Sequence, residues 1–238
     1  SPEVEKYDVS SMKHVASGAA TLSQELARQV KERLGIVVTD GYGLSECSPI
    51  VCLQNVQDAE EAPDTVGFLA PGTRARVLSP EGKDLGTGEE GELLVQGPQV
   101  MAGYLNNEEG NRASFTTQDR NDPDCWLRTG DVAKATKEGR LVLTGRTKDI
   151  IKMRGFQVSP KELEDLLYKQ PSVADAAVVG VKDEDGAEIP WAFLVATKEA
   201  AEQPEKERSE AVIQAINPNV AGYKKIKGIT WLEELPKR

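Results

Sequence analysis

Two short apolar runs on either side of an amphipathic segment constrain the fold of this chain more than any other feature. Residues 12–16 alternate in the manner of a β-strand, which we expect to be buried, and residues 36–38 begin a second strand. Between them, residues 23–33 carry apolar side chains at helical spacing, and Gly35 ends that pattern. The order strand, helix, strand predicts an α/β layer with a ligand site where the second strand ends.

The second strand leads directly into a glycine-rich segment at residues 41–46, which we expect to form a turn. Tyr42 offers an aromatic face to a nucleotide base, and Ser45 has a hydroxyl that can donate to a phosphate oxygen. Glu46 is the kind of hard oxygen ligand that Mg²⁺ prefers. An ordinary glycine turn with a solvated glutamate is the alternative, and this segment alone does not decide between the two.

Two later residues favour a nucleotide site. Asp131 follows a Thr-Gly pair that is typical of a turn, and its carboxylate can accept hydrogen bonds from both hydroxyls of a ribose. Arg146 has a planar guanidinium group suited to hydroxyls or phosphate. An Asx-turn is the alternative for Asp131, and the proximity of Arg146 in the sequence makes it the weaker one.

The stretch at residues 148–157 is densely cationic in a chain whose formal net charge is −10. Gly155 and the cations around it favour the close approach of an elongated anionic ligand, and a solvated charged strand is the alternative. The overall negative charge argues against nucleic acid or an anionic membrane as a partner. The sequence contains no apolar run long enough to span a bilayer.

The pattern predicts an α/β plus α+β protein in three parts: residues 1–64, part of an α/β subdomain; 65–147, a small antiparallel β subdomain; and 148–238, a compact α+β domain. Strands are expected in the middle part at residues 74–78, 91–96 and 141–144. The last part is expected to contain strands at 150–152, 173–181, 191–197 and 226–232, a hairpin at 155–158, and helices at 160–169 and 206–216. Ser159, Pro160 and Glu162 predict a capped start for the first of these helices. The acidic stretch 199–210 is expected to be a solvated loop and helix start.

Several other functions are excluded. Residues 86–91 match a dinucleotide-binding glycine pattern, but they contain two glutamates and precede a strand, so they predict an acidic turn. His14 is the only histidine, which excludes a Ser-His-Asp triad, and we expect it to be structural. Cys47, Cys52 and Cys125 lack the spacing of a zinc site and are expected to be reduced thiols. Because reduced thiols are typical of the cytosol, we expect a cytoplasmic protein.

Taken together, these segments resemble the adenylate-forming superfamily. The resemblance is closest to 4-coumarate–CoA ligases and similar acyl- or aryl-CoA synthetases, with luciferase-type enzymes as near relatives. It extends over essentially the whole chain, and the segments that carry it lie at residues 17–20, 41–46, 103–106, 126–131, 145–157 and 223–226. Enzymes of this kind convert a small carboxylic acid and MgATP to an acyl-adenylate, and then transfer the acyl group to coenzyme A.

The resemblance implies a role for each matching residue. The adenylate site would be lined by Gly18, Ala19, Ala20, Gly41, Tyr42 and Gly43, with Tyr42 stacked on adenine. Ser45 would contact phosphate, Glu46 would bind Mg²⁺, and Asp131 and Arg146 would hold the ribose. Lys152 and Gln157 would meet the adenylate during thioester formation, so that Ser45, Glu46 and Lys152 form the catalytic set. Arg154 and Gly155 would lie beside the coenzyme A channel, Asp40, Pro49 and Leu53 in the acyl pocket, and Lys148 at the hinge before the C-terminal domain.

Two departures and two absences qualify this resemblance. Ser45 stands where many relatives have Thr, and Asp40 stands where coumarate enzymes have Gln, which puts a plain hydroxycinnamate substrate in doubt. The pyrophosphate-binding loop and the N-terminal half of the acyl pocket would precede residue 1, and the adenylation lysine would follow residue 238. We therefore expect this chain to be the C-terminal half of a ligase, inactive in adenylation by itself.

Other interpretations remain open. The chain could be a nucleotide- or coenzyme A-binding module, or the complementing half of a split enzyme. A luciferase-like enzyme is less favoured. A peptide-synthetase adenylation domain is also less favoured, because Gly41 and Leu44 depart from the usual motif of those domains. A peroxisomal address also stays open, because a targeting tail could follow residue 238.

Overall fold

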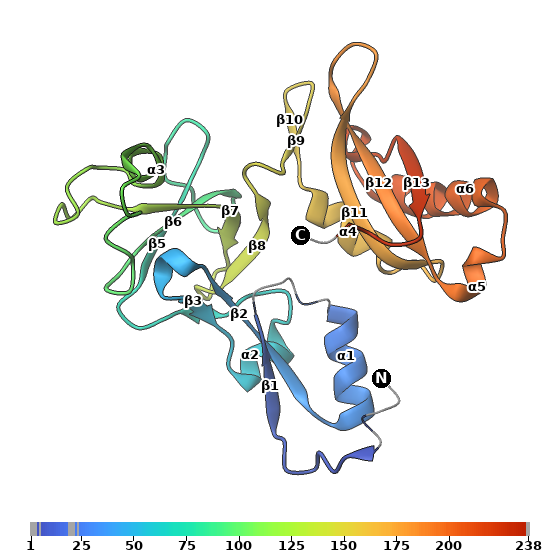
Figure 1. Cartoon of the computed structure of the whole chain (residues 1–238), viewed down its shortest axis with the longest axis horizontal. Coiled ribbons are helices and arrows are strands. Elements are labelled where there is room, and N and C mark those ends of the chain that lie inside the picture. Colours follow the sequence, from blue (N-terminus) through green and yellow to red (C-terminus); the bar gives the residue numbers. More distant parts are fainter. Residues whose placement is uncertain (1–3, 5, 19–21, 23, 237–238) are drawn as a thin grey trace. The chain divides into compact units, whose positions relative to one another are not determined.

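The computed structural model describes residues 4, 6–18, 22 and 24–236. The chain divides into two compact units, Ser1–Leu143 (unit 1) and Thr144–Arg238 (unit 2). Figure 1 shows the elements of both units. The sequence-based division into three parts, with boundaries after residues 64 and 147, stays a prediction.

The first layer of unit 1 is a four-stranded sheet in the order β1-β2-β3-β4. Its strands β1 and β2 are parallel, and the other neighbours are antiparallel. Two helices, α1 and α2, contact β2 (Figure 1). The predicted order strand, helix, strand is therefore confirmed. The elements of this layer are β1 (His14–Ser17), α1 (Gln24–Leu34), β2 (Val37–Gly43), the 3₁₀ helix η2 (Ser45–Cys47), β3 (Ile50–Leu53), α2 (Val56–Glu61) and β4 (Phe68–Leu69).

Two expectations for this layer are corrected. The prediction of a buried first strand is wrong, because His14 and Ala16 are exposed; alternation fixes which side chains share a face but not what covers that face. The glycine turn predicted at residues 41–46 is right only in its second half, because residues 41–43 continue β2. A Cβ atom on Gly43 would lie 2.1 Å from the carbonyl oxygen of Pro49, so glycine is needed there for the close approach of two backbones. The turn follows at η2.

The second layer of unit 1 is a sheet in the order β5-β6-β7-β8, with α3 between β6 and β7 in the chain. The prediction of antiparallel strands here is confirmed for β5, β6 and β7. The acidic turn is also confirmed, because Gly86 donates its amide hydrogen to Glu89 and β6 begins at Gly91. The elements are β5 (Arg74–Leu78), β6 (Gly91–Gln96), α3 (Glu108–Ser114), β7 (Leu127–Ala135) and β8 (Leu141–Arg146).

Strand β7 was not predicted, because its centre has the sequence of a turn. Thr129 and Gly130 lie inside the strand, where the register with β6 shifts between Glu92 and Leu94. Gly130 has a φ of 74°, which suits an irregular strand position that other residues rarely adopt. The hydroxyl of Thr129 donates to the carbonyl of Leu93 at 2.8 Å and replaces the regular ladder at this point.

The core of unit 1 contains residues of both sheets, and a buried ion pair connects the two layers. Asp58 of α2 accepts hydrogen bonds from Arg140 Nε at 3.0 Å and Nη2 at 2.9 Å. The two side chains are only 4% and 14% exposed. Arg140 lies in the β7–β8 turn and also covers the ring of Phe68. Asp58 in turn accepts from the amide of Asn55, as part of the capping box of α2.

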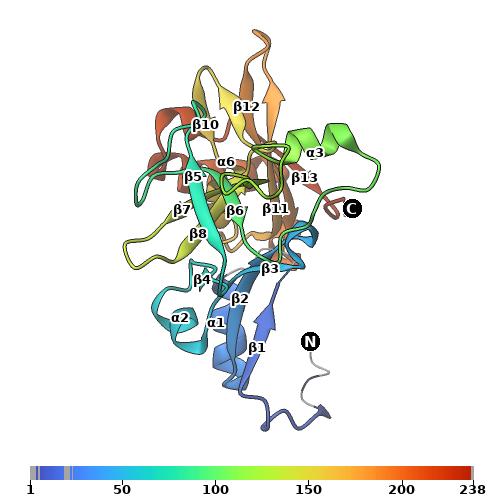
Figure 2. The same cartoon turned by 90° about the vertical axis from the view of Figure 1, so that its left-hand side faces the viewer.

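Unit 2 has a three-stranded sheet in the order β11-β12-β13, with β12 and β13 parallel. The helices α4 and α6 contact each other, and both contribute to one core with the sheet. Figure 1 labels both helices, and Figure 2 shows α6 and the strands β11, β12 and β13 from another side. The α+β character is as predicted from the sequence. The elements are β9 (Ile151–Met153), β10 (Phe156–Val158), α4 (Pro160–Leu167), β11 (Val173–Lys182), β12 (Glu188–Ala196), α5 (Lys198–Ala201), α6 (Glu205–Ile216), the 3₁₀ helices η3 (Asn217–Asn219) and η4 (Gly222–Lys224), and β13 (Gly228–Leu232).

The predicted capping of α4 is corrected in one respect. Ser159 stands at the N-cap position and Pro160 begins the helix, but the Ser159 side chain makes no capping bond. Its hydroxyl donates to the carbonyl of Thr144 instead. Glu162, the expected capping-box partner, pairs with Lys224 Nζ at 2.6 Å. The sequence also missed α5, which overlaps the beginning of the stretch 199–210 predicted as a solvated loop and helix start.

We predict that Asp58→Ala destabilises unit 1 by about 3 kcal/mol, because it leaves the Arg140 guanidinium buried without its main partner and removes part of the α2 cap. Urea denaturation, monitored by the hydrogen exchange of unit 1 amides, measures the change in the free energy of unfolding. The matched control is Asp84→Asn, which breaks the Arg76–Asp84 pair; there the Asp84 side chain is 63% exposed. The control should leave the urea midpoint nearly unchanged. Equal losses in both variants would contradict the importance of burial.

Candidate functional site

The predicted site residues fall into two sets, one in each unit. Unit 1 contains Gly18, Asp40, Gly41, Tyr42, Gly43, Ser45, Glu46, Pro49, Leu53 and Asp131. Unit 2 contains Arg146, Lys148, Lys152, Arg154, Gly155 and Gln157. Ala19 and Ala20 lie outside the described residues. The boundary between the units falls inside β8, after Leu143. Arg146, at the end of this strand, therefore counts with unit 2, whereas Asp131, with which it was expected to share a ribose, belongs to unit 1.

Within unit 1 the structure brings together Tyr42 of β2 and Asp131 of β7. The hydroxyl of Tyr42 donates to Asp131 Oδ2 at 2.6 Å, and this bond joins residues from both sheets. The backbone amide of Asp131 donates to the hydroxyl of Thr129 at 3.1 Å, which fixes the backbone at the same point. The Tyr42 ring is only 9% exposed and packs in the core. Its expected stacking on adenine stays a prediction.

Burial also sets the chemistry of the groups beside this bond. It raises the pKa of Tyr42 well above its ordinary value, and the charge of Asp131 raises it further. Burial likewise raises the pKa of the Cys47 thiol to about 11, with a contribution from the charge of Glu46, and that of Cys52 to about 12. These thiols are therefore protonated at neutral pH and are poor nucleophiles.

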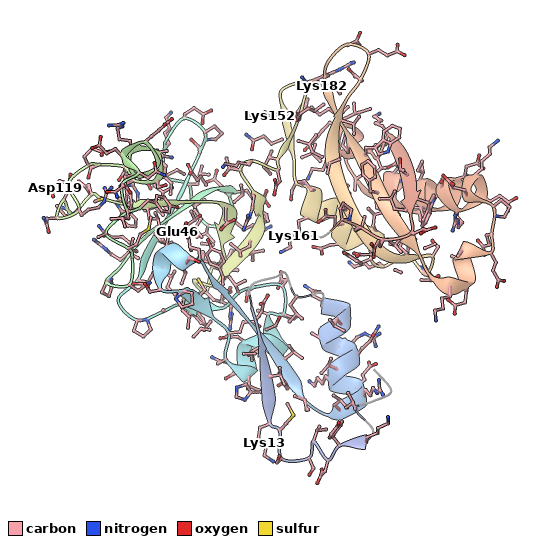
Figure 3. All side chains as sticks on the ribbon, in the orientation of Figure 1. Lys13, Glu46, Asp119, Lys152, Lys161 and Lys182 are labelled. Atoms are coloured by element: carbon pink, nitrogen blue, oxygen red, sulfur yellow. The ribbon has the colours of Figure 1, made fainter. Side chains whose placement is uncertain are left out.

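The segment after β2 positions Glu46. The amide of Leu44 donates to the carbonyl of Pro49 at 2.8 Å, and the amide of Cys47 donates to that of Leu44 at 2.8 Å, which closes the turn around η2. Cys47 is fully buried and anchors η2 in the core. Ser45 is exposed and Glu46 is half-buried. Figure 3 labels Glu46 on this short helix.

Sequence reasoning missed a contact of Glu46 with Tyr104. The Tyr104 hydroxyl donates to Glu46 Oε1 at 2.5 Å. This hydrogen bond is the main cause of a raised pKa for Tyr104. The two residues are 58 positions apart, and no local pattern connects them. The only available signal was that residues 103–106 belong to a segment of the family resemblance.

The three residues expected in the acyl pocket lie on or next to β2 and β3. Leu53 stands opposite Gly41 in the β2–β3 register and is 49% exposed. Asp40 is half-buried, and its amide donates to Gln54 Oε1 at 2.8 Å. Pro49 is exposed in the turn before β3. Their contact with a substrate stays a prediction.

In unit 2 the hairpin β9–β10 presents the predicted cationic segment. Lys152 and Gln157 are cross-strand partners, and both side chains are exposed. The turn between the strands consists of Arg154 and Gly155, with φ angles of 48° and 90°, as a tight two-residue hairpin turn requires. The structure thus places the two predicted adenylate contacts side by side, next to the two predicted coenzyme A contacts. Figure 3 labels Lys152 on this hairpin.

The exposed cations of unit 2 differ in their partners. Arg154 lies 3.2 Å from Asp185 and 3.6 Å from Asp183, both in the turn between β11 and β12. Arg146 and Lys148 are exposed at the end of β8 and just after it. The carbonyl of Arg146 accepts from the amides of Asp149 and Ile150, which makes a tight turn there.

The described part of the chain contains no group of three or more His, Cys, Asp or Glu side chains that could hold a metal ion, so no metal site made only of protein ligands is found there. Glu46 still fits Mg²⁺, because this ion is usually held by one or two carboxylates together with substrate phosphates and water. In addition, none of the described helices combines the length and the apolar character needed to cross a bilayer.

Comparison with protein families gives two matches. Residues 1–105 match the AMP-binding enzyme family, and residues 162–238 match the C-terminal domain of the same enzymes. "Probable 4-coumarate–CoA ligase 1" of Dictyostelium discoideum is 39% identical over 100% of this chain and 41% of its own length. Luciferin 4-monooxygenase of Photuris pensylvanica is 37% identical over 98% of the chain and 41% of its own length. The chain thus spans about two fifths of these relatives.

Solved structures give the same result. The anthranilate CoA ligase AuaEII in complex with anthranoyl-AMP superimposes with a TM-score of 0.86 and 28% identity, over 99% of this chain and 44% of the other. The predicted mixed α/β and α+β fold is therefore confirmed as that of adenylate-forming enzymes.

We predict that Tyr42→Phe lowers the free energy of unfolding of unit 1 by about 2 kcal/mol at neutral pH, because it removes a hydrogen bond to a carboxylate. The effect should depend on pH. An unfolded tyrosine ionises near pH 10 and the folded Tyr42 only at higher pH, so its contribution is complete below about pH 10 and is lost as the pH rises further. Urea denaturation from about pH 9 to about pH 11 should therefore show a steeper loss in the unaltered chain than in Tyr42→Phe.

The control for this prediction is Tyr7→Phe, at a tyrosine that is 70% exposed. It should follow the unaltered chain at every pH. The buried thiols also lower stability at alkaline pH in all three proteins, so the difference between slopes isolates Tyr42. Identical slopes in Tyr42→Phe and the unaltered chain would contradict the prediction.

Proposed function

Because this chain belongs to the adenylate-forming superfamily of AMP-binding enzymes, we propose that it is part of an acid–CoA ligase. In this proposal the enzyme activates a small aryl or acyl carboxylic acid with MgATP to an acyl-adenylate and then transfers the acyl group to coenzyme A. The proposal is supported by relatives named as 4-coumarate–CoA ligases and by the similarity to an anthranilate CoA ligase with bound anthranoyl-AMP.

One observation carries the proposal: two carboxylates of unit 1 are each held by a tyrosine hydroxyl around the end of β2. Asp131 is held by Tyr42 in the core, and Glu46, four residues after Tyr42, is held by Tyr104. A nucleoside triphosphate needs two kinds of acidic contact, one to its ribose hydroxyls and one to the cation on its phosphates. The two fixed carboxylates match these two needs.

In the proposed reaction, Asp131 binds the ribose hydroxyls and Ser45 donates its hydroxyl to a phosphate oxygen. Glu46 would hold Mg²⁺, which would supply positive charge to offset the repulsion between the acid and the triphosphate. Gly18, Gly41 and Gly43 let the backbone approach the nucleotide closely. Asp40, Pro49 and Leu53 line the acyl pocket.

Unit 2 supplies the cations in this proposal. Lys152 and Gln157, paired across the hairpin, contact the adenylate during thioester formation. Arg154 and Gly155 meet coenzyme A at the hairpin turn, Arg146 contributes to ribose binding, and Lys148 acts as the hinge. The charge of Lys152 and Arg154 suits the phosphates of both ligands.

The proposed compartment is the cytoplasm. All three cysteines are free, as expected where thiols are kept reduced. Because the chain spans about 41% of its curated relatives, we also propose that adenylation needs parts of the enzyme outside this span.

The proposal is tested by binding first and by catalysis second. We predict that the chain binds AMP and MgATP, and that Asp131→Ala weakens both by about 10-fold or more through the loss of the ribose contacts. Isothermal titration calorimetry measures these affinities. The control is Asp119→Ala, at an exposed acidic residue of unit 1 that lies on a separate loop (Figure 3). Affinities that are unchanged in Asp131→Ala would contradict its assignment.

For catalysis, we predict no ATP–pyrophosphate exchange by the chain alone. Fusion with the part of a 4-coumarate–CoA ligase outside the matched region should give acid-dependent thioester formation, which Glu46→Ala abolishes. Robust exchange by the isolated chain would refute the first expectation. Nucleotide binding without thioester formation in the fusion would favour a binding module instead.

A further inference from the structure

A tyrosine outside the predicted site contacts the proposed metal ligand. Tyr104 lies in the loop between β6 and α3, and its hydroxyl donates to Glu46 Oε1 at 2.5 Å. The Tyr104 side chain is 37% exposed, so it is not a core residue whose ring alone explains its position. The neighbouring Leu105 is 90% exposed, which shows that the loop is not buried as a whole.

The backbone of Tyr104 is held on both sides by one asparagine. Its amide donates to Asn111 Oδ1 at 2.6 Å, and its carbonyl accepts from Asn111 Nδ2 at 3.0 Å. Asn111 belongs to α3, so the helix fixes the loop. A Cβ atom on Gly103 would lie 2.7 Å from Asn111 Oδ1, and Gly103 has a φ of 146°; glycine is therefore required beside this contact.

The residues before Tyr104 are held as firmly. The amide of Met101 donates to the carbonyl of Glu46 at 2.8 Å. The loop therefore contacts the backbone of Glu46 through Met101 and its side chain through Tyr104. Arg120 Nε donates to the carbonyl of Ala102 at 3.1 Å, which attaches the loop to the segment before β7. Two independent contacts thus join the loop to Glu46, one through its backbone and one through its carboxylate.

We propose that Tyr104 is a positioning residue for the Glu46 carboxylate. Its hydroxyl holds Oε1 and thereby fixes the rotation of the carboxylate, so that Glu46 presents one orientation to Mg²⁺ and the triphosphate. Asn111 and Gly103 act through Tyr104 by setting its backbone. This inference rests on the proposed function, in which Glu46 binds the metal, and it adds to it the residues that orient this ligand.

The physical reason is that a lone carboxylate on a short 3₁₀ helix has two freely exchangeable oxygens unless a donor distinguishes them. Partners that hydrogen-bond a metal ligand orient it, and their loss lowers metal affinity by about 10- to 100-fold. A phenol suits this task, because its rigid ring fixes the position of the hydroxyl oxygen and only the hydroxyl hydrogen rotates.

The test compares Tyr104→Phe, Glu46→Gln and the double variant in the full chain. Calorimetry measures the affinity for ATP with Mg²⁺ and with EDTA, and the affinity for AMP in EDTA. Tyr104→Phe should lose about 10-fold in the Mg²⁺-dependent part of ATP binding and keep its affinity for AMP in EDTA. If Tyr104 had only a structural role, the substitution would lower both the Mg²⁺-dependent part of ATP binding and the affinity for AMP in EDTA. The double variant should lose no more Mg²⁺ dependence than Glu46→Gln, because both changes act on one carboxylate.

Two further variants sharpen the result. Tyr168→Phe is the matched control, since it removes a tyrosine–carboxylate hydrogen bond of 2.7 Å, to Asp175 in unit 2, and should leave the Mg²⁺ dependence unchanged. Asn111→Ala releases the backbone of Tyr104 and should shift the Mg²⁺ dependence in the same direction as Tyr104→Phe. It provides a second measurement if Tyr104→Phe folds poorly.

The outcomes separate this inference from the proposed function. Loss of Mg²⁺ dependence in Glu46→Gln, with full Mg²⁺ dependence in Tyr104→Phe, would overturn the positioning role alone. Full Mg²⁺ dependence in both variants would overturn the metal role of Glu46 as well. An unaltered chain that binds no ATP would overturn the proposed function together with the inference that rests on it.

Discussion

The hydrogen bond between Tyr42 and Asp131 is the constraint on which the rest of unit 1 depends. It connects the first sheet to the second across 89 positions of sequence, at a point where one partner lies in the core and the other is half-buried. Because the Tyr42 ring is packed among core residues, the position of the carboxylate is set by the packing of both sheets. The site in unit 1 can therefore form only when both sheets have formed. The ion pair of Asp58 and Arg140 also joins the two layers, through α2 and the β7–β8 turn.

The two carboxylates of the proposed site in unit 1, Asp131 and Glu46, each accept a hydrogen bond from a tyrosine, but they are buried to different degrees. Tyr42 holds Asp131 from within the core, whereas Tyr104 holds Glu46 from a loop that is partly exposed. A tyrosine can do both, because its rigid ring packs like an apolar residue and its hydroxyl reaches a polar partner. The deeper bond belongs to the residue proposed to bind ribose, a ligand of fixed shape. The shallower one belongs to the residue proposed to share a hydrated cation with phosphates, which needs access to water.

The sequence predicted those parts of the fold in which neighbours in the chain determine the outcome. Strands β5 and β6 have the predicted bounds, because alternation and flanking turn residues are local signals. Strand β7 was missed, because Thr129 and Gly130 have the chemistry of a turn, and only the pairing with β6 shows that they form an irregular strand position. The Ser159 hydroxyl bonds to Thr144 rather than to its helix, which no local rule predicts. For the site, residue types were predictable, but the contacts Tyr42–Asp131 and Tyr104–Glu46 were not, because each joins distant positions.

The cations of unit 2 are held in a different way from the carboxylates of unit 1, and this difference suits the proposed chemistry. Arg154 pairs with Asp183 and Asp185, but its side chain is 63% exposed, and that of Asp185 is 80% exposed. Such pairs contribute little, because water and salt screen them. A phosphate can therefore replace the two carboxylates around Arg154 at a small cost in free energy. In contrast, breaking the Tyr42–Asp131 bond would leave the buried Tyr42 hydroxyl without a hydrogen-bond partner. In the proposed function, unit 1 therefore supplies fixed carboxylates for one nucleotide, and unit 2 supplies exposed cations that exchange one anionic partner for another.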